Sequence, residues 1–234
     1  MNPDHIIVDK LKLISTATAT TVLFKHGLRN IWIRGAMPMG RKTGRIAGKA
    51  FTLRFIPSRE DLATPQAWSS PKSSRKAVEQ VPENSIVVVD AMGYRDAGIF
   101  GDILCARLAC RGAAGIVTDG AMRDIVGVES TGLPIWASSV AAPPAVCGLT
   151  FVGWQDPVAC GGVAVFPDDW ILADDDGAIV IPAAYIETLL ESALEQEALE
   201  EWILGEIKQG HSLDGVYPPD ERTLARYRKY CEEK

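Results

Sequence analysis

The chain has 234 residues, of which 47% are hydrophobic and 23% are charged, as in an ordinary globular protein with a sizeable core. Its formal net charge of −6 disfavours nonspecific binding to nucleic acid or to anionic membranes. The five cysteines are an odd number without CxxC spacing, which argues against a disulfide framework and against a cysteine zinc site.

The N-terminal third predicts helix, then strand, then a long polar excursion. Residues 5–28 have helical apolar spacing that ends near Gly27, and a β-like run follows at Ala50–Ile56. The Pro- and Ser-rich stretch after it predicts a surface excursion with a short helix near Ala77–Gln80. Loops of this length are uncommon unless they are functional, so we expect residues 61–76 to serve a site or an interface.

The middle of the chain predicts a buried sheet. Ile86–Val89 is an uninterrupted apolar strand, and the segment DILCARLACRG reads as a helix. The strands AAGIVTDG and LPIWAS follow it. This β-α-β-β order indicates an α/β fold with functional groups at the carboxyl ends of the strands.

The last third predicts a hairpin and a helical extension. The segment GGVAVFPDDWILADDDGAIVIP reads as antiparallel strands joined by a turn at 174–177. A long helix is predicted over 183–208, and a short charged helix follows it in the tail. We therefore expect one domain over residues 1–210 and a tail, 211–234, that packs on this domain or on a neighbouring subunit.

Three charged residues stand at the ends of predicted elements in the middle segment. Asp102 begins the predicted helix, and Arg123 and Asp124 follow the strand GIVTDG. Strand pairing would bring them to one crevice at the sheet edge. There Asp124 could hold Mg²⁺ or Mn²⁺, Arg123 suits a developing enolate oxygen, and Asp102 could orient water or move a proton. Backbone N–H groups just past Gly101 can bind a substrate carboxylate.

Simpler interpretations of the same residues remain open at this point. Asp102 could be a helix N-cap, and the Arg123–Asp124 pair could be a solvated loop or a cap for a following helix. The Asp119–Gly120 dipeptide is typical of a turn after a strand. Residue chemistry alone therefore gives a candidate site of low specificity.

The spacing and the neighbouring segments resemble a known family. The stretch GDILCARLACRGAAGIVTDGAMRD is similar to the core of the RraA-like family, in whose aldolases an Asp is followed, after twenty intervening residues, by Arg-Asp. Asp102 and Arg123-Asp124 have this spacing. The segments AFTLRFIPSRED, VACGGVAVFPDDW and ADDDGAIVIP extend the resemblance to about residues 13–220.

The resemblance implies a layered α/β/α sandwich similar to swivelling phosphohistidine domains, with a C-terminal helical extension. It also implies homotrimers or homohexamers with sites at subunit interfaces. In such a site Asp124 would be the metal ligand, Arg123 the enolate stabiliser, and Asp102 the acid that holds a metal water. The backbone of Gly98–Leu104, with Gly101, Ile103 and Leu104, would hold the substrate carboxylate.

Other charged residues are weaker candidates. A Glu of a neighbouring subunit's long helix completes some family sites, and Glu197, Glu200 and Glu201 are the candidates here, although solvated helix faces are commoner. The GYRDAGIFG loop places Tyr94, Arg95 and Asp96 near the predicted site, and Arg95 could recognise a second carboxylate or a sugar-acid hydroxyl. Arg54 and Arg59 are alternatives for that role.

The resemblance implies a divalent-metal-dependent aldolase or decarboxylase that acts on a 2-oxo acid such as 4-hydroxy-4-methyl-2-oxoglutarate or oxaloacetate. Two alternatives remain: a dehydratase or aldolase of a 2-keto-3-deoxy sugar acid at the same site, or a non-enzymatic regulator of ribonuclease activity. The N-terminus lacks a secretory pattern and no apolar run reaches the ~20 residues of a membrane span. We expect a cytoplasmic protein without nucleic-acid or membrane partners.

Overall fold

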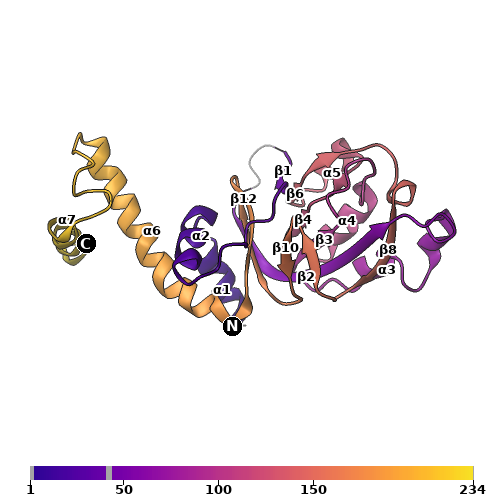
Figure 1. Cartoon of the computed structure of the whole chain (residues 1–234), viewed down its shortest axis with the longest axis horizontal. Coiled ribbons are helices and arrows are strands. Elements are labelled where there is room, and N and C mark those ends of the chain that lie inside the picture. Colours follow the sequence, from indigo (N-terminus) through magenta and orange to yellow (C-terminus); the bar gives the residue numbers. More distant parts are fainter. Residues whose placement is uncertain (1–2, 41–43, 234) are drawn as a thin grey trace.

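A curved eight-stranded sheet forms the centre of the molecule in the computed structural model, which describes residues 3–40 and 44–233 (Figure 1). The strand order is β1-β6-β4-β3-β2-β11-β12, and β8 also pairs with β2. Strands β2, β3, β4 and β6 are mutually parallel neighbours, whereas the others pair antiparallel. The strands are β1 Met37–Pro38, β2 Ile46–Pro57, β3 Ile86–Asp90, β4 Gly115–Thr118, β6 Ile135–Ala137, β8 Leu149–Trp154, β11 Trp170–Asp174 and β12 Gly177–Ile181.

Helices and two small sheets surround this centre. The α-helices are α1 Pro3–Leu11, α2 Thr16–Lys25, α3 Ser74–Val78, α4 Asp102–Cys110, α5 Ile125–Ser130, α6 Ile186–Lys208 and α7 Glu221–Glu232. Short 3-10 helices occupy Pro65–Ser69, Ala145–Cys147 and Ala183–Tyr185. The small sheets pair β5 Ala121–Met122 with β7 Ser139–Val140, and β9 Val158–Cys160 with β10 Val163–Val165. The predicted α/β fold is confirmed.

Strand β3 shows why its sequence is apolar without interruption. Val87 and Val89 belong to the core that the sheet shares with α3, α4 and α5. Ile86 and Val88 belong to a second core, shared with the β9–β10 hairpin. All four side chains are fully buried, and each contributes about 1.5–3 kcal/mol of transfer free energy. Because both faces of the strand are covered, its sequence does not alternate between apolar and polar residues as that of a surface strand does.

The structure corrects the predicted β-α-β-β order, because α5 lies between β4 and β6. This helix has only six residues, IVGVES, and contains a glycine and three β-branched residues. Such residues are weak helix formers, so the local sequence gives little helix signal. Val128 of α5 is buried in the core beside α4, and tertiary packing therefore stabilises the helix.

Capping residues explain the other shifts in element boundaries. The predicted 5–28 helical region divides in two, because the side chain of Ser15 caps α2 by accepting from the N–H of Thr18. Helix α3 starts at Ser74 rather than near Ala77, because the side chain of Ser73 caps it. The predicted β11–β12 hairpin is confirmed, with Asp174 opposite Gly177, but β10 pairs with β9 instead of joining it.

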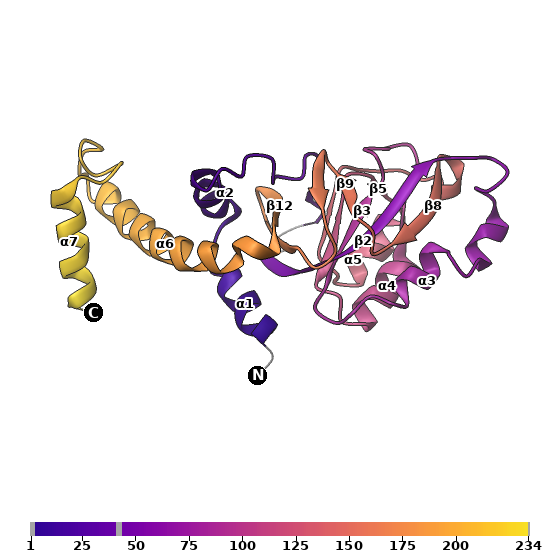
Figure 2. The same ribbon diagram turned by 60° about the horizontal axis from the view of Figure 1, so that its bottom comes forward.

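Helix α6 leads away from the sheet, and α7 lies at its far end (Figures 1 and 2). In this chain the tail packs on α6: the ring of Trp202 lies 5.5 Å from that of Tyr227, and Arg226 pairs with Glu206. Helices α1, α2 and the first half of α6 share a third apolar core with β11 and β12. No helix within the described residues is long and apolar enough to cross a membrane.

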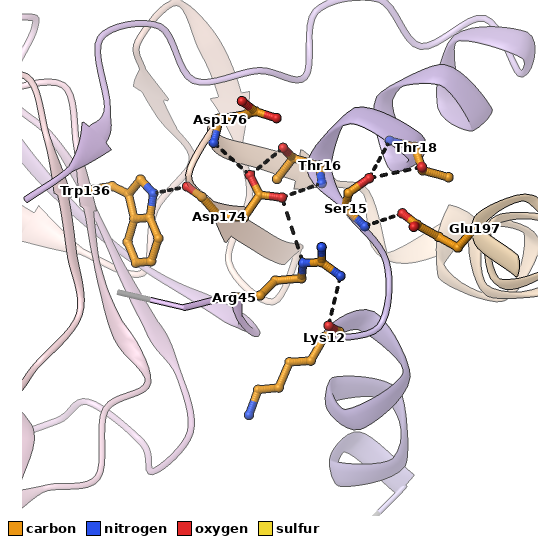
Figure 3. A network of polar contacts seen from close by, with 9 residues as sticks. All are labelled: Lys12, Ser15, Thr16, Thr18, Arg45, Trp136, Asp174, Asp176 and Glu197. Carbon is orange, nitrogen blue, oxygen red and sulfur yellow. Dashed lines mark hydrogen bonds and ion pairs between the residues drawn. The ribbon is translucent and has the colours of Figure 1, made fainter. Parts of the chain in front are cut away.

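Asp174, at the end of β11, joins the N-terminal helices to the sheet (Figure 3). Its carboxylate accepts from the backbone N–H of Thr16 at 2.8 Å and from the hydroxyl of Thr16 at 2.7 Å. It also accepts from the N–H of Asp176 at 3.0 Å, and Arg45 lies 3.9 Å away. The backbone carbonyl of Asp174 accepts from the indole of Trp136 at 2.7 Å.

We expect Asp174→Ala to lower the free energy of unfolding by about 2–3 kcal/mol, because it leaves donors of Thr16 and Asp176 without their charged acceptor. Urea unfolding followed by circular dichroism measures the change. Asp175→Ala is the matched control, since Asp175 is exposed and should change stability by less than ~0.5 kcal/mol. Equal losses in the two variants would contradict this role of Asp174.

Candidate active site

Two segments that are far apart in the sequence run side by side at the carboxyl ends of β3 and β4. The N–H of Ile99 donates to the carbonyl of Ala121 at 2.8 Å, and the N–H of Arg123 donates to the carbonyl of Phe100 at 3.0 Å. Gly98 also forms a parallel bridge with Ala121. These bonds place the start of α4 against the Arg123–Asp124 pair, as the sequence predicts.

Two glycines allow this close approach. A Cβ on Gly98 would lie 2.6 Å from the Cβ of Arg123, and a Cβ on Gly101 would overlap the Oδ2 atom of Asp124. Neither glycine has a positive φ, so clearance rather than backbone conformation requires them. The segment before α4 can therefore touch both charged side chains with its backbone.

Asp102 is the first residue of α4, and Gly101 is the N-cap. The Oδ1 atom of Asp102 accepts from the N–H of Ile103 at 2.7 Å. Asp102 is thus not the N-cap that a simpler interpretation of the sequence allows. One turn further along α4, burial raises the pKa of the Cys105 thiol to about 12, and the charge of Asp102 adds to the effect. This cysteine therefore stays protonated and supplies no nucleophile.

Arg123 and Asp124 form a partly exposed ion pair. The Nε atom of Arg123 lies 3.1 Å from the Oδ2 atom of Asp124, and the side chains are 32% and 44% exposed. Asp124 has left-handed backbone angles, φ 54° and ψ 44°, which cost a non-glycine residue about 1–3 kcal/mol. It stands at the N-cap of α5, yet its side chain makes no capping hydrogen bond. Its carboxylate points instead to Arg123 and to the Gly101 backbone.

The other predicted binding residues are less closely tied to this trio. Ile103 is 79% exposed on the first turn of α4, and Leu104 is half-buried beside it. Arg95 is exposed, and its Nη2 atom lies 3.8 Å from the place of a Cβ on Gly35. Within the described residues no hydrogen bond or ion pair joins Arg95 to Asp102, Arg123 or Asp124, so its substrate role stays a prediction.

The remaining candidates have other positions or partners. The ring of Tyr94 packs on the backbone of Gly148, and Asp96 is exposed. Arg59 forms an exposed ion pair with Asp61 at 2.6 Å, and Arg54 is an exposed residue of β2. The excursion that contains Arg59 borders a cavity of about 530 Å³ against β8.

The Glu side chains of α6 lie on the projecting helix. Glu197 accepts from the backbone N–H of Ser15 at 2.6 Å, and Glu200 accepts from Gln196 at 2.9 Å. Burial opposes ionisation of Glu197, but the hydrogen bonds from Ser15 and Thr18 outweigh it and lower its pKa. Glu197 thus fastens α6 to α2 in its own chain. The side chain of Glu201 makes no hydrogen bond or ion pair with the other residues that the structure describes.

Sequence reasoning missed two buried carboxylates beside the site. Asp90 is the last residue of β3, Asp119 directly follows β4, and each is 5% exposed. Asp119 accepts from the N–H groups of Ala91 at 2.8 Å and Gly161 at 3.0 Å, and Asp90 accepts from that of Ala159 at 3.1 Å. They hold the β9–β10 hairpin and the loop after β3 at the sheet edge. An acid directly after an apolar strand, in VVVD and IVTD, is the signal that could have found them.

The donor atoms suit a cation that is held largely by water and substrate. Within residues 3–40 and 44–233, no group of three or more His, Cys, Asp or Glu side chains could hold a metal. Mg²⁺ commonly binds through one or two carboxylates and keeps several waters. The partly exposed Asp124, with Asp102 nearby, fits this mode of binding.

Comparison with known proteins assigns the family. Residues 7–180 match the RraA-like family, described as Aldolase/RraA, and the chain belongs to this family. The crystal structure of Streptomyces coelicolor RraAS2 is similar, with 34% identity and a TM-score of 0.76 over 86% of this chain and 97% of that one. RraAS2 is described as an unusual member of the RNase ES inhibitor RraA protein family.

Two curated relatives differ in how far they match. The 4-hydroxy-4-methyl-2-oxoglutarate aldolase of Thermus thermophilus is 34% identical over 153 residues, which are 63% of this chain and 84% of that protein. Protein DlpA of Legionella pneumophila is 28% identical over 170 residues, which are 73% of this chain. The chain covers only 27% of the length of DlpA.

Asp119 predicts a pH dependence of stability. Burial raises its pKa, although the N–H groups of Gly161 and Ala91 oppose the rise. A raised pKa in the folded state means that the native protein holds this proton more tightly, so stability falls as pH rises from the unfolded value, about 4, through the folded one. Asp119→Asn cannot ionise, and we expect its stability to fall less over this range, after a constant loss of about 1–3 kcal/mol for one mismatched hydrogen bond.

Urea unfolding of both proteins at a series of pH values measures this difference. Asp96→Asn is the control, because Asp96 is exposed and its replacement should leave the wild-type pH profile unchanged. Parallel profiles for wild type and Asp119→Asn would show that Asp119 has no raised pKa.

Proposed function

We propose that the protein is a divalent-metal-dependent carbon–carbon lyase that releases pyruvate from a 2-oxo acid by retro-aldol cleavage or decarboxylation. The observation that carries this proposal is the meeting of Asp102, Arg123 and Asp124 at one sheet edge, through the bond between Arg123 N–H and the carbonyl of Phe100. The aldolase name of the Thermus relative supports the same class of reaction.

The residues have separable tasks in this reaction. N–H groups in the first turn of α4, which begins at Asp102, would bind a carboxylate of the substrate. Arg123 stabilises negative charge on the keto oxygen as the carbon–carbon bond breaks, because its guanidinium keeps its charge at any working pH. Asp102 orients water or carries the proton that the pyruvyl carbon gains. Asp124 would hold Mg²⁺ or Mn²⁺, which would supply Lewis-acid polarisation of the 2-oxo acid.

We further propose that a second copy of the chain covers the mouth of the site in a homotrimer or homohexamer. Ile103 directly follows Asp102, and Val126 lies two residues after Asp124; these two residues are 79% and 86% exposed. Apolar side chains this exposed, on both helices at one site, favour a surface that another subunit buries. A glutamate such as Glu201 from the neighbouring α6 could then complete the site.

Oxaloacetate decarboxylation tests the proposal directly. We expect turnover with Mg²⁺ or Mn²⁺, loss of turnover with EDTA, and recovery when the metal is restored. Arg123→Ala and Asp124→Ala should each lower kcat/KM at least about 100-fold, since each removes charge stabilisation that is specific to the transition state. Arg107→Ala is the control, because Arg107 lies further along α4 and pairs with Glu79, away from the site. Undiminished activity without metal, or in either site variant, would refute the mechanism.

A panel of 2-oxo acids addresses the substrate and the role of Arg95. If Arg95 binds a second carboxylate, Arg95→Ala should raise KM about 10-fold or more for dicarboxylic substrates and leave KM unchanged for monocarboxylic 4-hydroxy-2-oxo acids. Product analysis over the panel also separates retro-aldol cleavage from dehydration of a 2-keto-3-deoxy sugar acid. Equal KM changes for both substrate classes would remove Arg95 from substrate recognition.

A regulator of ribonuclease activity is the second candidate, favoured by the likeness to RraAS2. It requires metal-independent binding to an endoribonuclease and no turnover of 2-oxo acids. A binding assay with purified ribonuclease and with EDTA present, run beside the decarboxylation assay, separates the two functions.

A further inference from the structure

Helix α5 carries a glycine at the point where it meets the acid of α4. A Cβ built on Gly127 would lie 2.7 Å from the Cβ of Asp102, 2.8 Å from its Oδ2 atom and 3.1 Å from its Cγ atom. Carbon atoms that are not bonded pack at about 3.5–4.0 Å, so any side chain at position 127 must displace Asp102 or one of the helices. Gly127 has ordinary helical angles, and its space, not its conformation, is the special feature.

Asp102 has little freedom to move away from that contact. Its Oδ1 atom accepts from the N–H of Ile103, while its Oδ2 atom faces Gly127. The preceding residue, Gly101, touches the Asp124 carboxylate, and Asp124 is the N-cap of α5. The two helices are therefore already in contact on the other side of Asp102, and a side chain at 127 would force them apart at the site itself.

We propose that Gly127 is a positioning residue: its missing side chain seats the Asp102 carboxylate between α4 and α5, beside Arg123 and Asp124. An acid at 102 and a side chain at 127 then exclude one another by size. A glycine inside a helix is normally disfavoured relative to alanine, and the contact with Asp102 is the compensating constraint. The steric coupling is independent of function, whereas its consequence for turnover rests on the lyase proposed above.

Thermal unfolding in a double-mutant cycle tests the coupling without any assay of activity. We expect Gly127→Ala to lower Tm by roughly 3–10 °C in the wild-type background, as overpacked sites do. In the Asp102→Gly background, which removes the Cβ contact, the same change should leave Tm unaltered or raise it by about 2–4 °C. Asp102→Asn has the shape of Asp without its charge, so in that background the fall should persist.

Gly205→Ala is the matched control, because Gly205 also lies inside a helix, but among the described residues nothing beyond its chain neighbours and its own helix backbone lies within 4 Å of an added Cβ. It should raise Tm by about 2–4 °C in every background. Additive Tm changes for Gly127→Ala and Asp102→Gly, within about 1 °C, would overturn the coupling, as would an unchanged Tm for Gly127→Ala alone.

Turnover of oxaloacetate then tests positioning. Gly127→Ala should lower kcat about 10-fold or more, with a smaller change in KM, and should cause no further loss in an Asp102→Gly enzyme. A Gly127→Ala enzyme with unchanged kcat would refute the positioning role even if Tm falls. If the wild type turns over no 2-oxo acid, the proposed lyase fails, and the Tm cycle still decides whether residues 102 and 127 are coupled.

Discussion

The parallel pairing of β3 with β4 is the constraint on which the site depends. The register sets Val89 opposite Thr118, so both strands end at the same level and the chain leaves them side by side. The loop after β3 returns along the segment after β4 through the bond between Ile99 N–H and the carbonyl of Ala121. Helix α4 then leads the chain back to the start of β4. Residues more than twenty positions apart, such as Gly101 and Asp124, thereby come into direct contact.

The parts of this arrangement that follow from local patterns could be predicted from the sequence. Strands buried on both faces can be recognised as apolar runs, and the turn residues at Asp174–Gly177 predict the hairpin. Helix α5 could not be predicted in this way, because four of its six residues are glycine or β-branched and therefore weak helix formers, and because its first turn follows a left-handed Asp124. Its stability comes from packing on α4, which only the assembled fold supplies.

The site shows the same division between local and tertiary information. The sequence predicts that Asp102, Arg123 and Asp124 stand at the ends of secondary-structure elements. The fold then brings these residues to one sheet edge. The hydrogen-bond partners of Glu197 and Asp119 cannot be predicted from the sequence, because only the tertiary structure brings Ser15 to Glu197 and Gly161 to Asp119. Glycines 98, 101 and 127 look like ordinary loop or helix residues until the neighbouring side chains are placed.

The chemistry of this site is separable from the stability of the fold. Arg123 and Asp124 are partly exposed and lie outside the three apolar cores, and the sheet pairing that positions them uses backbone atoms. Replacement of Arg123 or Asp124 would therefore leave the architecture in place. A shared fold can then occur in a relative named as an aldolase and in one described with an RNase inhibitor family. Function must be decided by the few residues at the sheet edge, because the cores carry no information about it.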